Sequence, residues 1–210
     1  MSKADEFDPG KIEALPILPL RNAVLFPGLV MPLVIGREKT LRLLDAVADT
    51  GRIIGVITQK DKDIADPGPD DLYVTGTTAR ILRVVKERDQ GVDIVVQGIQ
   101  RFRTVEYGKT EPFLTADVQL LPDHNTDDAE VEALTNSLKT LTSEVFSLMP
   151  EMPSTAAEMV ENVNSPSRLV YLVTSNLSIS TEDKIRVLEI EDIADARRET
   201  LKTLSHHLEV

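Results

Sequence analysis

The chain has 210 residues, 41% of them hydrophobic, so it is long enough to bury one sizeable core or two smaller ones. Its net charge of −12 disfavours general binding to nucleic acid, and the absence of cysteine excludes disulfides, thiol catalysis and cysteine-ligated metals. No apolar run approaches the roughly 20 residues that span a bilayer, and the acidic first residues are typical of neither a secretory signal nor a transit peptide.

The first half of the chain has the pattern of strands. Apolar runs at Val30–Ile35 and Ile53–Ile57 indicate two strands, and leucines at helical spacing within Glu38–Ala48 indicate a helix between them. The segment Asp61–Asp71 is rich in Pro, Gly and Asp and therefore predicts a loop.

A β-hairpin is the clearest local prediction. Thr77–Lys86 alternates imperfectly between apolar and polar residues, and Val92–Ile99 is a β-branched run. Between them, Asp89 favours a turn and Gly91 can adopt the positive φ that a tight hairpin requires. Two further strands are predicted at Phe102–Tyr107 and Phe113–Leu121.

The pattern changes to helices near Pro122–Asp128. Apolar residues then recur at spacings of 3, 4, 3, 4 and 3, which predicts one stripe on a long helix: Val131, Leu134, Leu138, Leu141, Val145 and Leu148. Further helices are expected to begin at Ser165-Pro166, Thr181 and about Asp192. The last one reaches Val210 without a stop signal, which fits either an ordinary frayed end or a chain that continues.

These patterns predict an α+β protein in three parts. Residues 1–11 form a disordered tail, residues 12–122 a β-rich subdomain, and residues 123–210 an all-helical subdomain.

A nucleotide site is the first chemistry to test, because Lys39-Thr40 follows a predicted strand and begins a predicted helix, as in a P-loop. The P-loop needs glycine before the lysine and another five residues earlier, but Glu38 and Leu33 stand there. We therefore expect Lys39 to be an exposed helix residue. The three histidines, His124, His206 and His207, lack metal-ligand spacing and are expected to be solvated.

The sequence also lacks the Gly-x-Ser-x-Gly motif of serine hydrolases and has no cysteine nucleophile. We expect no catalytic residue, cofactor site or metal site in this chain. The segment Arg101-Phe102-Arg103 could bind phosphates, but the favoured interpretation is a charged outer sheet face with Phe102 in the core.

Two apolar segments are candidates for contact with unfolded protein. Met149, Met152 and Met159 are flexible thioethers in a proline-interrupted region, and such side chains fit varied apolar partners. Their alternative, and commoner, role is to fill gaps in a helical core. Three residues of a loop punctuated by Pro and Gly are candidates with the same alternative: Phe26, Leu29 and Met31.

Several segments, in order along the chain, resemble the amino-terminal domain of the Lon-type ATP-dependent proteases. They are Leu15–Asn22, Val24–Gly28, Leu33–Lys39, Asp71–Ala79, Gly98–Phe102, Ser165–Leu169 and Lys184–Glu189. The resemblance runs from about Leu15 to the end of the chain. No single segment is decisive, but the ordered set is specific.

The resemblance implies a β-rich, PUA-like pseudo-barrel followed by a helical bundle. In the family, this domain helps to select and hold unfolded, damaged or tagged proteins for a cytoplasmic homo-hexamer, which degrades misfolded, abnormal and short-lived regulatory proteins. ATP and Mg²⁺ are implied only for the full-length protein, whose ATPase and serine–lysine peptidase domains come later in the chain. No catalytic or nucleotide-binding residue can be carried over to this segment.

Two alternatives stay open at this point. Stand-alone adaptor proteins also carry a LON domain, and a reading frame that stops at Val210 would favour them. A PUA-like RNA-binding module is the other alternative, although the acidic composition disfavours nucleic-acid binding.

Overall fold

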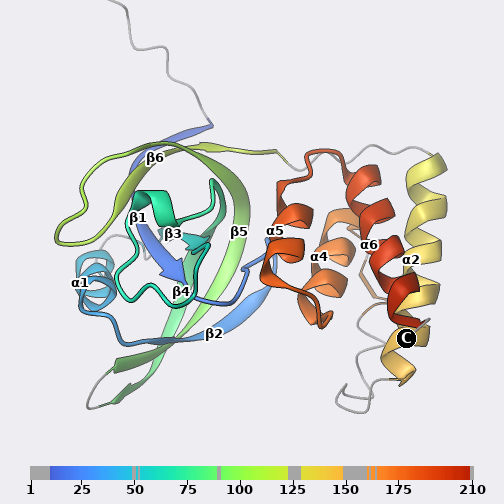
Figure 1. The fold of residues 1–210 in the computed structure, drawn as a ribbon, viewed down its shortest axis with the longest axis horizontal. Coiled ribbons are helices and arrows are strands. Elements are labelled where there is room, and N and C mark those ends of the chain that lie inside the picture. Colours follow the sequence, from blue (N-terminus) through green and yellow to red (C-terminus); the bar gives the residue numbers. More distant parts are fainter. Residues whose placement is uncertain are drawn as a thin grey trace, which may run out of the picture.

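The computed structural model describes residues 10–48, 51, 53–88, 91–122, 129–148, 160, 162–163 and 165–208. A β-rich unit is followed by a helical unit that packs beside it (Figure 1). The strands are β1 (Lys11–Leu20), β2 (Val30–Ile35), β3 (Ile53–Thr58), β4 (Thr75–Arg88), β5 (Gly91–Tyr107) and β6 (Thr115–Leu120). The helices are α1 (Glu38–Val47), α2 (Ala129–Leu148), α4 (Pro166–Asn176), α5 (Thr181–Glu189) and α6 (Ile193–Leu208), with a short 3-10 turn at Pro69–Asp71.

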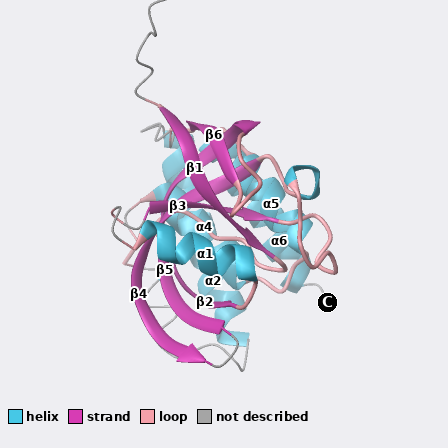
Figure 2. Ribbon diagram, turned by 90° about the vertical axis from the view of Figure 1, so that its left-hand side faces the viewer, coloured by secondary structure: helices cyan, strands magenta, loops and turns pink. Residues whose placement is uncertain are grey.

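The six strands form a pseudo-barrel. Their order is β2-β5-β4-β3-β1-β6, and a further pairing between β5 and β6 closes five of them into a ring. Within the described strands, β1 and β3 pair in parallel and the other pairs are antiparallel. Strand β2 pairs with the first part of β5 and stands outside the ring, as the curved sheet in Figure 2 shows. The mixed sheet with its separate helices confirms the α+β prediction.

The β-rich unit has two groups of core side chains. Leu43 and Val47 of α1 are buried against residues such as Ile54 and Ile94, so the helix covers one part of the barrel interior. The other group surrounds Phe102, which is fully buried as predicted. Each such side chain contributes roughly 1.5–3 kcal/mol by leaving water.

The prediction for strand β5 is wrong in one respect: the sequence pattern divided this segment into two strands, Val92–Ile99 and Phe102–Tyr107. The structure has one 17-residue strand, Gly91–Tyr107. Its pairing with β4 shifts register near Ile99, where Gln100 pairs with Thr78 but Gly98 with Ala79. A bulge of this kind changes which face each side chain occupies, so one strand looks like two in the sequence.

The predicted hairpin is confirmed, because β4 and β5 pair from Arg88 and Gly91 onwards. Glycine at position 91 is required by a close approach: a Cβ there would lie 2.6 Å from the backbone oxygen of Ile35. Two other boundaries differ from the predictions. Lys11, assigned to the tail, pairs with Gln119 in the sheet, and Phe113 lies before β6 rather than in it.

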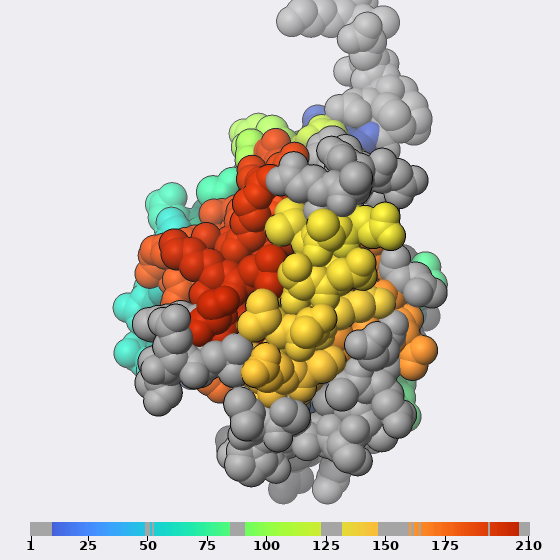
Figure 3. All heavy atoms as spheres, turned by 90° about the vertical axis from the view of Figure 1, so that its right-hand side faces the viewer, coloured from blue at the N-terminus to red at the C-terminus, as the bar shows by residue number. Residues whose placement is uncertain are grey.

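The helical unit is built around one apolar cluster. Leu138 and Val145 of the predicted stripe are buried in it, and Leu141 packs against it. Helix α2 lies along α6, and together they form the outer face of this unit (Figure 3). Helix α4 begins as predicted, with Ser165 as the N-cap accepting from the Arg168 backbone N–H. The last strand ends at Leu120 and α2 begins at Ala129; the predicted boundary segment between them falls mostly on residues outside the described ranges.

Arg101 of β5 joins the two units. Its side chain is only 2% exposed, and its guanidinium donates to the backbone oxygens of Leu188 at 3.0 Å, Ile190 at 2.7 Å and Pro122 at 3.3 Å. Leu188 and Ile190 lie at the carboxyl end of α5, where helix carbonyls have no partner within the helix. The expected charged outer face is therefore wrong for Arg101: the helical unit covers that side of β5. Arg103 is exposed and pairs with Glu191 at 3.3 Å.

Replacing Arg101 should destabilise the fold much more than replacing Arg103. We expect Arg101→Met to lower the free energy of unfolding by about 2–4 kcal/mol, because the buried Leu188 carbonyl and the partly buried carbonyls of Ile190 and Pro122 lose a charged donor. Arg103→Met removes one exposed ion pair and should cost no more than about 1 kcal/mol. Urea unfolding of both variants measures the difference; equal, small effects would show that Arg101 does not hold the units together.

Candidate functional site

The structure places the predicted contact residue Phe26 inside the protein. Its side chain is fully buried in the core of the helical unit and stacks on Tyr171, with ring centroids 5.4 Å apart. The prediction that Phe26 contacts unfolded protein is therefore corrected. The apolar loop after β1 joins the barrel to the helices instead of presenting a free surface.

The other predicted contacts have different outcomes. Leu29 is half-buried and packs against the helical core, whereas Met31 is half-buried on β2 against the barrel core. Both stay predictions. The three methionines, Met149, Met152 and Met159, lie outside the described residues.

A groove that the sequence did not reveal runs between the end of β1 and strand β2. We call it the β1–β2 groove; it has a volume of about 570 Å³ and is lined by Pro19–Ala23 on one wall and Leu33–Arg37 on the other, with Thr40. Arg37 helps to fix one end, because its guanidinium donates to Gln59 Oε1 at 2.6 Å and to the Pro19 carbonyl at 3.4 Å. Burial lowers the pKa of Arg37, and the nearby Arg21 lowers it further, whereas Asp66 raises it.

A second groove lies where α1 meets the loop between β5 and β6. This α1 groove is also about 570 Å³ in volume. Most of its walls are apolar, and charged residues stand at the edge. The lining includes Ala14, Pro16, Ala46, Val47, Lys109, Glu111, Pro112 and Phe113. A groove of this composition suits apolar side chains better than phosphates or sugars.

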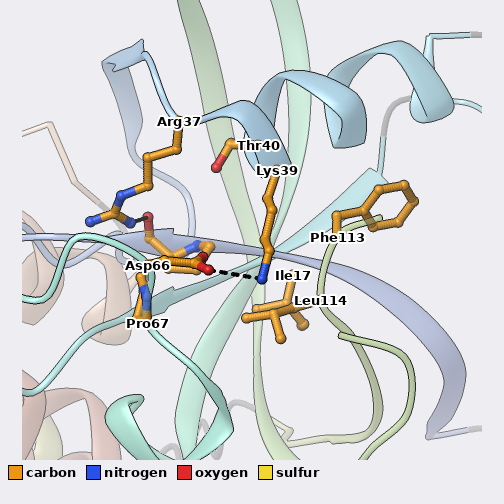
Figure 4. A pocket seen from close by; sticks show the side chains of 9 residues that line it. Ile17, Arg37, Lys39, Thr40, Asp66, Pro67, Phe113 and Leu114 are labelled. Carbon is orange, nitrogen blue, oxygen red and sulfur yellow. Dashed lines mark hydrogen bonds and ion pairs between the residues drawn. The ribbon is translucent and has the colours of Figure 1, made fainter. Parts of the chain in front are cut away.

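Lys39, which was tested above as part of a nucleotide site, instead belongs to a cluster of ion pairs (Figure 4). Lys39, at the start of α1, points to Asp66 of the loop after β3 and is 2.9 Å from both Asp66 Oδ2 and Glu111 Oε1. Hydrogen bonds that the Lys39 ammonium donates to the carboxylates of Glu111 and Asp66 raise its pKa above the ordinary 10.5. Its charge is therefore used to join three segments of the barrel and is not presented to a phosphate.

Among the described residues there is neither a cluster of metal-ligand side chains nor a helix able to span a membrane. None of their His, Asp and Glu side chains gather in a group of three that could ligate a metal ion. In the same part of the chain, no helix combines the length and apolar character needed to cross a bilayer.

Residues 14–206 match the family of the ATP-dependent protease La (LON) substrate-binding domain. The chain belongs to this family. It is 42% identical over 198 residues to a Lon protease of Anaeromyxobacter dehalogenans, and 44% identical over 200 residues to Lon protease 2 of Myxococcus xanthus. These alignments cover 93% and 94% of the chain but only 23% and 24% of the relatives, so the chain spans about a quarter of their length.

Solved structures of Lon domains share the fold. The N-terminal domain of the Mycobacterium avium complex Lon protease matches with a TM-score of 0.73 at 21% identity, covering 93% of this chain and all of that one. A Lon N-terminal domain protein from Xanthomonas campestris matches with a TM-score of 0.65 at 18% identity, covering 91% of this chain and 98% of that one. The predicted LON-domain fold is thereby confirmed.

Changing Phe26 should act on stability rather than on binding. Phe26→Ala removes a buried ring and with it the stacking contact on Tyr171, so we expect the free energy of unfolding to fall by about 3–5 kcal/mol. Thermal and urea melts would measure this loss. A variant that keeps wild-type stability but no longer binds unfolded protein would contradict the buried position and restore Phe26 as a contact.

The Lys39 cluster should affect stability with a definite pH dependence. Because the folded-state pKa of Lys39 is raised, its charge stabilises the fold fully below the ordinary value of 10.5, and this contribution is lost as pH rises through the raised value. The difference in unfolding free energy between wild type and Lys39→Met should thus stay constant from neutral pH to 10.5 and shrink above it. Urea midpoints across this range test the sign; a difference that grows above 10.5 would contradict it.

Proposed function

We propose that this LON substrate-binding domain recognises and holds unfolded polypeptide for a Lon-type protease. The family match over residues 14–206 carries the proposal, because the matched domain is described as substrate-binding and the matched relatives are proteases. A protease acts on polypeptide, and damage to a protein exposes extended apolar chain. Both grooves of the barrel suit such a ligand, since their walls are largely apolar.

The α1 groove shows how apolar contact and solubility are compatible. Ala46, Pro112 and Phe113 contribute apolar surface, while the exposed Lys109 and Glu111 add charge beside it. Charges around a small apolar surface keep a free domain in solution and still allow apolar side chains to bind. Contacts of this size are weak one at a time.

The full-length protein, in our proposal, is a cytoplasmic homo-hexamer that uses ATP and Mg²⁺ in separate ATPase and peptidase domains to degrade misfolded, abnormal and short-lived regulatory proteins. The share of the relatives outside this chain, about three quarters of their length, leaves room for such domains. Several copies of the substrate-binding domain in one assembly would convert weak single contacts into firm attachment through high effective concentration.

The RNA-binding alternative is disfavoured by the structure. Arg101, the first residue of the segment Arg101-Phe102-Arg103, is buried and donates to three backbone carbonyls. Arg103 is left as an exposed residue that already pairs with Glu191. With a net charge of −12 for the chain, few phosphates could be neutralised at physiological salt.

The isolated domain should bind chemically unfolded protein weakly and native protein not at all. A labelled, permanently unfolded protein is titrated into wild type and into two variants, Phe113→Ser in the α1 groove and a triple change of the three methionines to Ser. We expect either variant to weaken binding if its site contributes, while thermal melts show whether the fold is intact.

Equal affinity for native and unfolded protein, or no binding to either, would contradict the proposed function. Loss of stability in the methionine variant would assign those residues to the core instead, as the alternative interpretation holds. The full-length proposal is tested separately, by the length of the natural reading frame and by ATP-dependent degradation of the same labelled protein.

A further inference from the structure

Strand β2 has one edge without a partner strand among the described residues. It stands at the end of the strand order, with β5 on its only paired side. The β1–β2 groove is lined by the second half of β2, from Leu33 to Gly36, and by the end of β1, and none of the described residues that line it belongs to β5. An edge strand presents a row of backbone donors and acceptors that another extended chain can pair with.

Two observations establish which backbone groups face this groove. At one end of β2, the Gly98 N–H donates to the Leu29 carbonyl at 2.9 Å. At the other end, the Ile35 carbonyl oxygen lies 2.6 Å from where a Cβ of Gly91 would be, so it too is directed at β5. Since direction alternates along a strand, Leu29, Met31, Leu33 and Ile35 point their polar groups to β5, and Val30, Pro32 and Val34 point theirs away.

The same three residues have exposed side chains. Val34 is 71% exposed and Val30 is 55% exposed, which are high values for valine in a strand. Leu33 and Ile35, between and after them, are buried in the barrel core. The edge therefore offers the N–H groups of Val30 and Val34 and three carbonyls, beside an apolar outer surface.

Pro32 removes one donor from this edge. It pairs with Val95 of β5 without loss, because its nitrogen faces away from β5. A proline here limits continuous pairing with a second long strand, such as β2 of another copy of this chain. Short pairing around Val34, next to the groove, is still possible.

We propose that an extended segment of the protein substrate binds in the β1–β2 groove as an additional strand on the free edge of β2. The inference rests on the proposed function, which makes the occupant a polypeptide, and it assigns the place and the mode of binding. Backbone hydrogen bonds are the same for every sequence, so strand addition gives the sequence tolerance that recognition of many unfolded proteins needs. The outer faces of Val30 and Val34 add a preference for apolar side chains.

A proline at position 34 tests the backbone contribution. Val34→Pro removes the N–H nearest the groove but leaves the β5 ladder intact, as native Pro32 does two residues earlier. Val34→Ala is the matched control, because it shortens the side chain and keeps the N–H. The probe is a fluorescent peptide of alternating valine and serine with a glutamate at each end. We expect Val34→Pro to weaken its binding about fivefold or more, the effect of one lost hydrogen bond, and Val34→Ala to weaken it less.

A second measurement does not depend on the folding of a variant. The same peptide, N-methylated at every residue, keeps its side chains but cannot donate backbone hydrogen bonds. We expect its binding to the wild-type domain to be lost. In addition, hydrogen exchange of the Val34 amide should slow when the unmethylated peptide is added.

The outcomes separate this inference from the proposed function. If unfolded protein binds the wild-type domain while Val34→Pro and the N-methylated peptide bind as strongly as their parents, strand addition on β2 is overturned and substrate binding stands. If the wild-type domain binds no unfolded protein, the proposed function fails as well. If Val34→Pro unfolds at a lower temperature than wild type, the comparison of the unmethylated and N-methylated peptides on the wild-type domain decides the question.

Discussion

The arrangement of this domain depends on a charged group buried between its two units. The side chain of Arg101 extends from β5 toward the helical unit, and its guanidinium donates to two carbonyls at the carboxyl end of α5. A cation at this end of a helix also interacts favourably with the helix dipole. Burial of so polar a group is tolerable because its terminal nitrogens donate to three backbone carbonyls, so the position of α5 against β5 is strongly specified.

The path of the loop between β1 and β2 depends on this position of the helical unit. Phe26 is buried among the helices, the Arg168 guanidinium donates to the Gly28 carbonyl at 3.3 Å, and the Thr181 hydroxyl donates to Asn22 Oδ1 at 2.9 Å. The chain that leaves β1 is thus drawn to the helical unit before it returns as β2. Consequently β1 and β2 do not pair, and the groove remains between them. The same contacts that join the two units also leave a strand edge free.

Sequence reasoning identified the family and the fold class, but it placed the buried Phe26 on a binding surface. It identified the domain family, from ordered segments such as Leu15–Asn22, and it expected apolar, adaptable contacts. It selected Phe26 because an apolar residue between Pro and Gly suggests an exposed loop, but such a residue fits a buried connection equally well. Neither groove could be predicted. The walls of the α1 groove come from segments far apart in the chain, such as Pro16 and Phe113. The walls of the β1–β2 groove come from two strands that are close in the chain but do not pair with each other. Only the packed structure brings these residues together.

By itself, the sequence determined the local elements. These are the hairpin whose second strand begins at Gly91, the helix that begins after Ser165, the apolar helix stripe that includes the buried Leu138, and the change from strands to helices. These follow from periodicity, capping and turn chemistry, which act between residues close in the chain. The tertiary structure alone decided that β5 is continuous through a bulge, that Arg101 is buried, and that β2 keeps a free edge. Each of these depends on which distant segments become neighbours, and the same local pattern is compatible with more than one such neighbour.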